Sequence, residues 1–375
     1  MTRDLPPARR TLVIAANSAW NIANFRAPLI EALVEAGWEV VALAPDDGSV
    51  AVESLRGARF EPVSIDSSGT SVLRDGRLLV DYVRILRRLQ PAAFLGFTVK
   101  PNVYGSLAAH MLGIKVINNI SGLGTAFMRP GLLNWVVRRL YYLALRRSAR
   151  VFFQNPDDRD LFLAQGLVRA RQAGLVPGSG VDLQKFRPIG KPRAANAPFR
   201  FLFVGRLLRD KGLAEYAEAA RRLRPSWPSV EFAMLGFADS DNRSAVPMAD
   251  VRRWQDENLV NYLGETEDVR PFLADCDCVV LPSYREGLPR SLLEASAMGK
   301  PMVATDVPGC RDLVVDGENG LLCEARSATS LASAMESMLK LPPARRAAMG
   351  RKARTIVEQR FDQSLVTQAY LEALQ

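Results

Sequence analysis

The sequence predicts an α/β protein of two domains, each built around a parallel β-sheet. Three observations support this prediction. Short apolar, β-rich runs alternate with longer helical stretches along the whole chain, as in proteins whose strands are joined by helical crossovers. The chain has 375 residues, which exceeds what a single hydrophobic core of ordinary size usually holds. A stretch rich in glycine and proline follows residue 176, and the alternation then begins again.

Before that stretch, the apolar runs predict six strands separated by helices. The strands span residues 11–15, 39–44, 60–65, 92–97, 115–118 and 150–154. Most of the helical patterns end at a glycine or before a proline, both of which stop helices. The predicted helices span residues 27–36, 76–89, 103–112, 132–148 and 156–165.

The second half shows the same alternation. Its predicted strands span residues 199–204, 230–235, 260–263, 278–282 and 301–305. Its predicted helices span residues 213–223, 249–257, 269–274, 290–297 and 327–339, with a last helical stretch from residue 345 to the end. The segment 177–182, with the prolines between 188 and 198, predicts the domain boundary. We therefore expect one domain over residues 1–186 and the other over 187–360.

Composition places the chain among globular proteins and suggests an anionic partner. Hydrophobic residues make up 48% and charged residues 24%, which argues against disordered and fibrous classes. Lysine and arginine number 49 against 40 acidic residues, a formal net charge of +9. This excess favours a nucleotide, a phospholipid surface or a nucleic acid. Because the basic residues are spread along the chain without a nucleic-acid-binding motif, we expect no nucleic-acid partner.

Cysteine and histidine usage predicts neither a zinc site nor a disulfide framework. The four cysteines contain no CxxC pair, and the single histidine, His110, lies far from them in sequence. We interpret Cys276 and Cys278 as core residues because they stand in an apolar run. His110 lies within a helical stretch, and we interpret it as structural.

We expect no signal peptide and no membrane-spanning segment. The longest uncharged run, residues 11–25, contains three asparagines and is shorter than a bilayer requires. The cysteine usage is that of a reduced, cytoplasmic protein. Peripheral attachment to the cytoplasmic face of the inner membrane stays open.

The loop after the first strand of the second half carries positive charge where parallel sheets bind ligands. It contains Gly205, Arg206 and Lys211. Loops at the carboxyl ends of parallel strands line the ligand crevice of open α/β sheets. Gly205 would let the backbone approach a ligand closely, and the two cations could neutralise a diphosphate. Two solvated surface charges are the alternative interpretation, and the sequence leaves both open.

A more specific segment follows the strand predicted over residues 278–282. Pro289 suits the first position of the next helix. The backbone amides of Arg290, Ser291 and Leu292 would then point into the crevice, together with the positive end of the helix dipole. This arrangement predicts an anion site.

Two glutamates in the same segment suggest separate roles on one elongated ligand. Glu286 and Glu294 are eight residues apart, which corresponds to about 12 Å along a helix. The acid and base of a glycoside hydrolase lie closer, at roughly 5 to 9.5 Å. A ligand with a sugar at one end and a ribose at the other fits the longer spacing.

The pattern Pro-Ser-x-x-Glu-Gly-x-Pro-x-x-x-Leu-Glu-Ala, which begins at Pro282, resembles the retaining family 4 glycosyltransferases. Gly299, Pro301 and the run 303–305 follow it, and the Gly205-to-Gly212 segment is similar to the diphosphate-binding loop of that family. The resemblance implies a GT-B fold, in which two Rossmann-like domains face each other across a cleft. It further implies an N-terminal acceptor domain, a C-terminal nucleotide-sugar domain, and a helix over residues 361–375 that packs back on the former.

The resemblance also implies roles for single residues. Arg206 and Lys211 would hold the diphosphate, Glu286 would contact the transferred sugar, and Glu294 would bind the ribose hydroxyls. The remaining donor-binding positions implied by the motifs are Gly205, Gly287, Leu288, Arg290, Ser291 and Leu292.

Members of the family need no metal, and we expect neither a metal nor another cofactor. Two acidic pairs suggest the opposite, Asp239 with Asp241 and Asp275 with Asp277. Because a divalent cation prefers carboxylates that converge with substrate phosphates, and because Arg206 and Lys211 already supply positive charge, we do not favour a metal role.

The first half narrows the resemblance to one branch of the family. Residues 100–106 and 117–125 look like enzymes that extend lipid-linked oligosaccharides or bacterial surface polysaccharides. Two departures concern the acceptor side: Ser121 with Gly122 stands where many members have a histidine and a glycine, and Asn17 begins a segment that replaces a glycine-rich loop. The acceptor-side candidates are Asn17, Lys100, Asn118 and Ser121.

The helix predicted over residues 132–148 has a basic, aromatic stripe. At 100° per residue, five side chains fall within about 100° of one another: Trp135, Arg138, Arg139, Tyr142 and Arg146. Such a stripe is attracted to an anionic membrane surface. A solvated face whose aromatic rings bury against a neighbour is the alternative.

The leading hypothesis is a retaining transfer of a hexosyl or N-acetylhexosaminyl group from a UDP-sugar to a polyprenyl-diphosphate-linked acceptor. A sugar-nucleotide epimerase of the same architecture and a glycosyltransferase with a soluble acceptor are the alternatives. A nicotinamide-dependent oxidoreductase is disfavoured, because no GxGxxG follows the first strand of either half.

Overall fold

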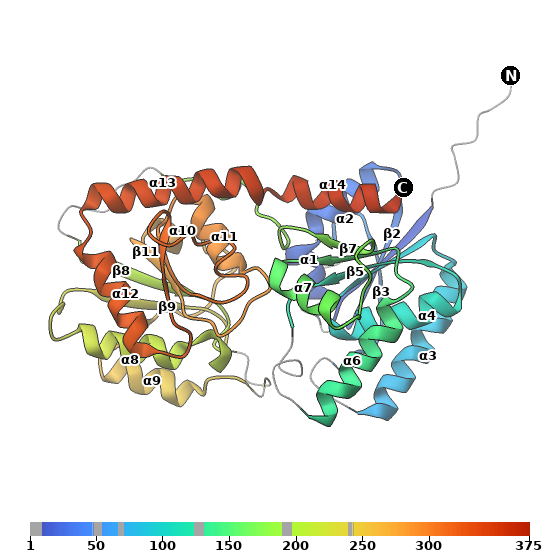
Figure 1. Cartoon of the computed structure of the whole chain (residues 1–375), viewed down its shortest axis with the longest axis horizontal. Helices are drawn as coiled ribbons and strands as arrows, with labels where there is room; N and C mark the ends of the chain where they lie inside the picture. The colour runs from blue at the N-terminus through green and yellow to red at the C-terminus, as the bar shows by residue number, and fades with distance from the viewer. Residues whose placement is uncertain are drawn as a thin grey trace, which may run out of the picture. The chain divides into compact units, whose positions relative to one another are not determined.

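The computed structural model describes residues 10–46, 48, 55–66, 71–123, 131–189, 197–238, 242 and 244–375. The chain divides into two compact units (Figure 1). The first comprises Met1–Ser179 with Gln363–Gln375, and the second Gly180–Asp362. Each unit contains an open parallel sheet with helices around it, so the predicted pair of Rossmann-like α/β domains is confirmed.

The sheet of the first unit is parallel throughout, in the order β3-β2-β1-β4-β5-β6-β7. Its strands are β1 (Thr11–Ala15), β2 (Glu39–Ala44), β3 (Arg59–Pro62), β4 (Ala93–Phe97), β5 (Lys115–Ile120), β6 (Arg150–Phe153) and β7 (Ala173–Leu175). Leu12 and Ile14 of β1 belong to one hydrophobic cluster, and Val13 and Ala15 to another. Successive side chains of a strand point to opposite faces, so both faces of this sheet are buried.

Residues of the surrounding helices complete each of these hydrophobic clusters. They are α1 (Ala19–Phe25), α2 (Ala27–Glu35), α3 (Val72–Leu89), α4 (Ser106–Met111), α6 (Leu132–Leu145), α7 (Pro156–Ala164) and α14 (Gln363–Leu374). Residues of α1, α2 and α14 share the cluster of Leu12, whereas residues of α3 and α4 share that of Val13. A third cluster joins α6 and α7 to β5 and β6 through Tyr141, Leu145 and Phe162.

The second unit contains a six-stranded parallel sheet in the order β10-β9-β8-β11-β12-β13. The strands are β8 (Arg200–Val204), β9 (Glu231–Leu235), β10 (Asn261–Tyr262), β11 (Cys278–Leu281), β12 (Met302–Thr305) and β13 (Gly320–Cys323). The helices are α8 (Leu213–Leu223), α9 (Met248–Asp256), α10 (Arg270–Ala274), α11 (Arg290–Ala297), α12 (Ala328–Lys340) and α13 (Pro343–Arg360). All four cysteines are free and buried in this unit.

Several predicted elements have other bounds. The strand predicted over 60–65 is β3, and the helix predicted over 132–148 ends at Leu145. The helix predicted over 103–112 is a π-helix over Pro101–Gly105 followed by α4. Here Gly105 packs so close to the Phe94 ring that a β-carbon would lie 2.3 Å from it. Periodicity alone does not reveal such a change of helical pitch.

Among the described α-helices and strands, three lie where none was predicted. They are α1, which the side chain of Ser18 caps by accepting from the amide of Asn21, and the edge strands β7 and β13. Each of these strands has only three or four residues, too few for a recognisable alternation.

The last helix of the chain is part of the first unit. Tyr370 of α14 is completely buried, and its ring centroid lies 5.7 Å from that of Phe97 and 5.0 Å from that of Phe152. Its hydroxyl accepts a hydrogen bond of 2.8 Å from the side-chain amide of Asn119. The sheet of the first unit is therefore covered in part by the C-terminal end of the chain.

Candidate active site

The order of the second sheet identifies its ligand-binding edge. Strand order reverses between β8 and β11, which pair directly through Phe201 with Cys278 and Leu202 with Val279. Open α/β sheets bind ligands outside the carboxyl ends of the strands at such a point. The loops that leave β8 and β11 there carry most of the predicted donor-side residues.

Two glycines hold the loops of this edge in backbone contact. Gly212, which ends the loop after β8, has a φ of 73°, and a β-carbon on it would lie 2.1 Å from the carbonyl oxygen of Pro282. Gly236, after β9, has a φ of 155°, and a β-carbon there would lie 1.8 Å from the carbonyl oxygen of Gly205. The amide of Tyr284 also donates to the Asp210 carbonyl at 2.8 Å. The backbone therefore fixes the relative positions of these loops.

Lys211 and Glu286 meet across the two loops. The Nζ of Lys211 donates to Oε1 of Glu286 at 2.5 Å, and both side chains are largely buried. Arg206 is exposed and directly follows Gly205 in the same loop as Lys211. The structure thus joins the predicted sugar-contacting carboxylate to one of the two predicted diphosphate-binding cations.

The helix α11 has the predicted bounds, Arg290–Ala297, but Pro289 lies just before its first residue and not at its first position. Pro289 precedes the helix as its cap and has extended backbone angles, and Arg290 is the first helical residue. The amide of Leu292 donates to the Pro289 carbonyl at 3.2 Å, so it does not point openly into the crevice as predicted. Because the first turn is closed this tightly, the amides of Arg290 and Ser291 are those nearest the open end of the helix.

Glu294 lies in the second turn of α11 and is held by Arg290. It is 7% exposed, and the Nε of Arg290 donates to its Oε1 at 2.7 Å. Burial raises the pKa of Glu294, while the charge of Arg290 opposes that increase. A buried carboxylate with one cationic partner retains oxygen lone pairs for a ligand.

Backbone on the far side of the β11 loop supports Glu286. Gly309, after β12, has a φ of 82°, and a β-carbon there would lie 2.7 Å from the Gly287 carbonyl oxygen. The amide of Glu286 donates to the Pro308 carbonyl at 3.2 Å. The predicted donor residue Leu288 is buried, with 9% exposed. Gly309 is a site residue that sequence reasoning missed, although its place just after a predicted strand was a usable signal.

The four acceptor-side candidates of the first unit have different surroundings. The Nζ of Lys100 donates to Asp75 at 2.6 Å, and the hydroxyl of Tyr104 donates to the other oxygen of that carboxylate at 2.9 Å. Asn17 is half-buried just after β1, and Ser121 is exposed just after β5. Asn17 and Ser121 therefore follow carboxyl ends of strands, as an acceptor site would require.

Asn118, the fourth candidate, is a structural residue. It is completely buried, and its amide nitrogen donates to Asn102 at 2.9 Å and to Ser106 at 2.8 Å. Its oxygen accepts from Ser148 at 2.6 Å. All its polar atoms are satisfied inside the unit, so it has no means of contacting an acceptor.

The neighbouring Asn119, which sequence reasoning missed, lies at the centre of a polar cluster. Its oxygen accepts from the hydroxyl of Ser121 at 3.0 Å and from the amide of Gln154 at 3.2 Å, and its nitrogen donates to Tyr370. Two asparagines in succession within an apolar strand were the available signal. Asn119 positions Ser121 at this edge.

The other predicted roles concern His110 and metals. The Nε2–H of His110 donates to the Ala144 carbonyl at 2.8 Å, and burial lowers its pKa, which agrees with a structural residue. Asp277 accepts from the Arg200 amide at 2.8 Å, and Asp275 pairs with the Arg200 guanidinium. Residues 239–241 lie outside the described residues. Within the described ranges, no group of three or more histidine, cysteine or acidic side chains could hold a metal ion.

Two family models match consecutive parts of the chain. Residues 22–178 match the glycosyl transferase 4-like domain, and residues 198–341 match the glycosyl transferases group 1 model. Together they cover most of both units. The chain belongs to the family 4 glycosyltransferases.

Two relatives of this glycosyltransferase resemble it over most of their length. The N,N'-diacetylbacillosaminyl-diphospho-undecaprenol alpha-1,3-N-acetylgalactosaminyltransferase of Campylobacter jejuni is 27% identical over 372 residues, which cover 94% of this chain and 95% of that protein. The UDP-Gal:alpha-D-GlcNAc-diphosphoundecaprenol alpha-1,3-galactosyltransferase of Escherichia coli is 24% identical over 279 residues, which cover 71% and 70%.

Solved structures confirm the GT-B fold of this glycosyltransferase. HepE of Anabaena in complex with UDP aligns with a TM-score of 0.78 and 21% identity over 97% of this chain and 99% of that one. Sucrose-phosphate synthase of Thermosynechococcus elongatus aligns with a TM-score of 0.79 and 19% identity over 97% and 98%. At these identities the likeness establishes the fold.

Proposed function

We propose that this glycosyltransferase transfers a hexosyl or N-acetylhexosaminyl group from a UDP-sugar to a polyprenyl-diphosphate-linked sugar and retains the anomeric configuration. The observation that carries the proposal is that Glu286 and Glu294 are each held by a cation, Lys211 and Arg290, beside the reversal of strand order. The names of the two relatives, which include UDP-galactose and diphosphoundecaprenol-linked sugars, support the donor and acceptor classes.

In this proposal the protein stabilises the departing diphosphate. Negative charge develops on the leaving group as the bond to the sugar breaks. Lys211, Arg206 and the first turn of α11 supply positive potential at the loops that the backbone contacts of Gly212 fix. These cations can provide the stabilisation that a bound metal gives in other transferases, so we propose a metal-independent reaction.

Glu294 is assigned to the ribose of the donor. A carboxylate accepts hydrogen bonds from two neighbouring hydroxyls, and its low exposure gives those bonds a low-dielectric environment. The charge and hydrogen bond of Arg290 oppose the rise in the pKa of Glu294 that burial causes. We therefore assign Arg290 to orienting Glu294, which leaves the diphosphate to Lys211 and Arg206.

Glu286 is assigned to hydroxyls of the transferred sugar. Its ion pair with Lys211 links the sugar contact to the diphosphate contact. An acceptor hydroxyl that attacks from the side of the leaving group, through an oxocarbenium-like ion pair, retains the configuration without a covalent enzyme intermediate. This route requires no enzyme nucleophile.

Asn17 and Ser121 remain the acceptor-side candidates of the proposal. A polyprenyl carrier resides in a membrane, so we propose that the enzyme acts as a peripheral protein at the cytoplasmic face of the inner membrane, where nucleotide sugars are supplied. No helix among the described residues has the length and apolar character needed to cross a bilayer. The exposed face of α6 is the proposed contact.

The experiment that tests the donor class compares UDP, GDP and ADP in thermal unfolding. A ligand at 100 times its dissociation constant stabilises the folded state by about 2.7 kcal/mol. UDP should raise the melting temperature of the wild type, and the rise should be absent in Lys211→Ala. Equal stabilisation by all three nucleotides, or by none, would contradict the proposal.

The experiment that tests the reaction incubates the enzyme with UDP-sugars, with and without a polyprenyl-diphosphate-linked sugar. Release of UDP that depends on the lipid-linked acceptor, together with an α-linked product from an α-linked donor, is expected. Conversion of the UDP-sugar without acceptor would favour an epimerase. Transfer to a free sugar at an equal rate would favour a soluble acceptor.

A further inference from the structure

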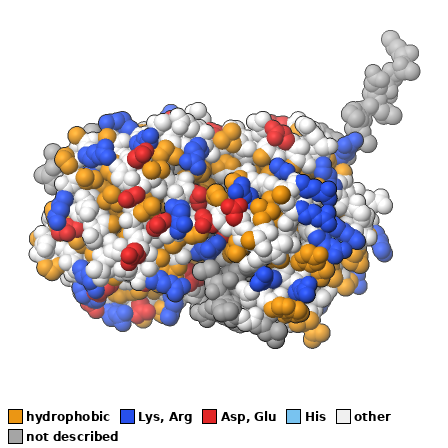
Figure 2. Space-filling model, in the orientation of Figure 1, with side chains coloured by type: hydrophobic (Ala, Val, Ile, Leu, Met, Phe, Trp, Pro, Cys, Tyr) orange, Lys and Arg blue, Asp and Glu red, His pale blue; other side chains and the backbone are white. Residues whose placement is uncertain are grey.

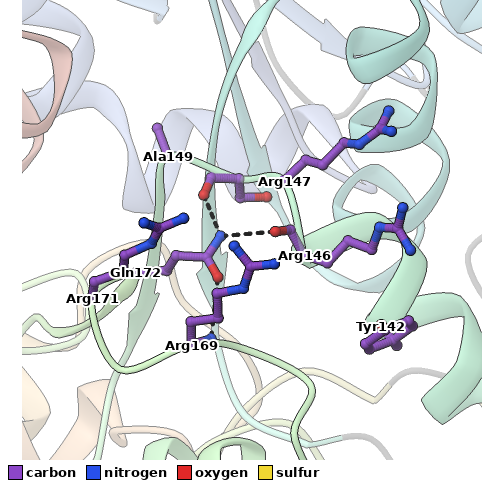
Figure 3. Close-up of a pocket in the computed structure, with 8 residues that line it drawn as sticks. Tyr142, Arg146, Arg147, Ala149, Arg169, Arg171 and Gln172 are labelled. Carbon is purple, nitrogen blue, oxygen red and sulfur yellow. Dashed lines mark hydrogen bonds between the residues drawn. The ribbon is translucent and has the colours of Figure 1, made fainter.

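A basic hollow lies on the first unit, at the end of the sheet opposite the candidate acceptor residues (Figure 3). Its volume is about 680 Å³, and its lining residues are Tyr142, Arg146, Arg147, Ser148, Ala149, Arg169, Arg171 and Gln172. These residues come from the end of α6 and from the loops that lead into β6 and β7. Those loops meet the amino ends of the strands, whereas Asn17 and Ser121 follow carboxyl ends. The hollow is therefore separate from the proposed acceptor edge.

A buried glutamine builds the floor of the hollow. Gln172 is 5% exposed, and its amide nitrogen donates to the carbonyls of Leu145, Arg146 and Ser148 at 3.2, 3.3 and 2.5 Å. Its oxygen accepts from the amide of Arg169 at 3.1 Å. These bonds tie the end of α6 to the loop before β7, so the backbone that carries the arginines is held in place.

Four arginine side chains surround this floor. Figure 3 shows Arg146 and Arg147 on the α6 side and Arg169 and Arg171 on the β7 side. All four are exposed, and within the described ranges no carboxylate forms an ion pair with any of them. Like charges gathered around one hollow repel one another unless an anion lies between them. Planar guanidinium groups match phosphate oxygens in particular.

The outer face of α6 continues from the hollow as an aromatic and basic stripe. Trp135, Arg139, Tyr142 and Arg146 follow one another at helical spacing, and the guanidinium carbons of the two arginines lie 5.6 and 5.8 Å from the rings of Trp135 and Tyr142. Trp135 is 58% exposed and Leu143 is 47% exposed. About half or more of the surface of each of these two side chains is therefore exposed.

The opposite face of the helix is the buried one. Tyr141 and Leu145 of α6 belong to the cluster with Phe162. An apolar, aromatic outer face beside concentrated positive charge is the composition of an interfacial membrane helix. Figure 2 shows Lys and Arg side chains gathered on the first unit, to the right in the view.

We propose that the hollow and the outer face of α6 form one docking surface for an anionic phospholipid bilayer. The four arginines bind headgroup phosphates, and Trp135, Tyr142 and Leu143 enter the interfacial region. The inference rests on the proposed function only in that a lipid-linked acceptor brings the enzyme to a bilayer. A free phosphate would need the arginines but not Trp135 or Leu143, so the exposed apolar side chains favour the lipid surface.

The test is flotation of the full chain with vesicles of phosphatidylcholine, with and without phosphatidylglycerol. The double variant Arg169→Ala/Arg171→Ala removes two charges outside α6. We expect its affinity for the anionic vesicles to fall about 30-fold, which corresponds to about 1 kcal/mol for each arginine near a charged surface. Trp135→Ser should weaken binding to the same vesicles without changing its dependence on salt.

The matched control is Arg252→Ala/Arg351→Ala, which removes two exposed arginines of the second unit. It should bind the vesicles as the wild type does. An equal loss in both double variants, or equal wild-type binding to both kinds of vesicle, would overturn the proposal. The proposal would also be overturned if duplex DNA or inorganic phosphate released the wild type from the vesicles at a phosphate concentration equal to that of the lipid.

Measurements without vesicles separate this inference from the proposed function. Both double variants should bind UDP and have the melting temperature of the wild type. A wild type that fails to bind UDP yet floats with anionic vesicles would contradict the proposed function alone. Full UDP binding together with unchanged flotation of Arg169→Ala/Arg171→Ala would contradict the docking surface alone.

Discussion

Each of the two units contains a parallel sheet, but the carboxyl edges of the two sheets are built differently. In the second unit, glycines with positive φ allow loops to touch through their backbones, at Gly212 with Pro282 and Gly309 with Gly287. In the first unit, side chains do the equivalent work, as in the hydrogen bonds of Asn119 with Ser121 and Tyr370. Backbone contacts admit little variation, whereas side-chain networks are readily altered. This difference fits the roles proposed for the two edges, with a fixed nucleotide diphosphate at the second unit and a variable acceptor at the first.

The largest effect that would test the comparison is expected from Lys211→Ala. Loss of one preorganised donor to a developing negative charge lowers turnover about 10²- to 10³-fold. Initial rates of UDP release measure it. Arg209→Ala is the control, because Arg209 is exposed in the same loop, and its rate should stay near that of the wild type. Similar losses of rate in both variants would mean that Lys211 contributes only general positive charge.

Gly212→Ala should come next, with a loss of about 10²-fold in turnover, since small displacements of catalytic groups cost that much. The new β-carbon would meet the Pro282 carbonyl and push the two loops apart. Gly264→Ala is the control, because Gly264 has a similar φ of 80° and no atom within 4 Å of the added carbon. Calorimetric titration with UDP distinguishes the two explanations. A displaced loop weakens UDP binding in Gly212→Ala alone, whereas general backbone strain weakens it in both variants.

Glu294→Gln should weaken UDP binding about 10- to 100-fold, the range for hydrogen bonds to a charged group. It should also raise stability at neutral pH. Folding raises the pKa of Glu294. The contribution of Glu294 to the free energy of unfolding is therefore most favourable below its pKa in the unfolded chain, about 4.3. That contribution is lost as the pH rises through its pKa in the folded protein. Melting temperatures of variant and wild type should therefore converge in acid and separate towards pH 8. Parallel curves would refute this.

The smallest effects are expected at the proposed acceptor edge, where Ser121→Ala and Asn118→Ala should behave differently. Ser121→Ala should raise the KM for the acceptor a few-fold and leave the melting temperature unchanged, because this side chain is exposed. Asn118→Ala should instead lower stability by roughly 1–3 kcal/mol, since it leaves buried partners unsatisfied. Acceptor kinetics and thermal unfolding of the two variants decide between a binding and a structural residue.

The sequence predicted the strand–helix alternation and the two charged loops of the second unit because both depend on local patterns. The apolar runs end within one residue of the ends of β8 and β11, and the charged residues follow in the next loop. The interlocking of these loops could not be predicted, since Gly236 and Gly309 act on atoms far away in sequence. A residue type shows that a positive φ is possible, but not what lies within 3 Å of it.

The first unit was less predictable because its polar residues satisfy one another. Asn118 and Lys100 have the residue types of a binding site, yet their partners Ser148 and Asp75 come from other elements. The basic hollow was missed for a related reason. Arg169 and Arg171 are distant in sequence from the stripe of α6, and only the bonds of Gln172 bring the two segments together.

The position of α14 has a consequence for the order in which the chain can fold during synthesis. The second unit is a continuous stretch of sequence and is fully available once Asp362 has left the ribosome. The first unit, although translated earlier, lacks the ring that fills the space between Phe97 and Phe152 until Tyr370 emerges. The amino-terminal half is therefore translated first and completed last.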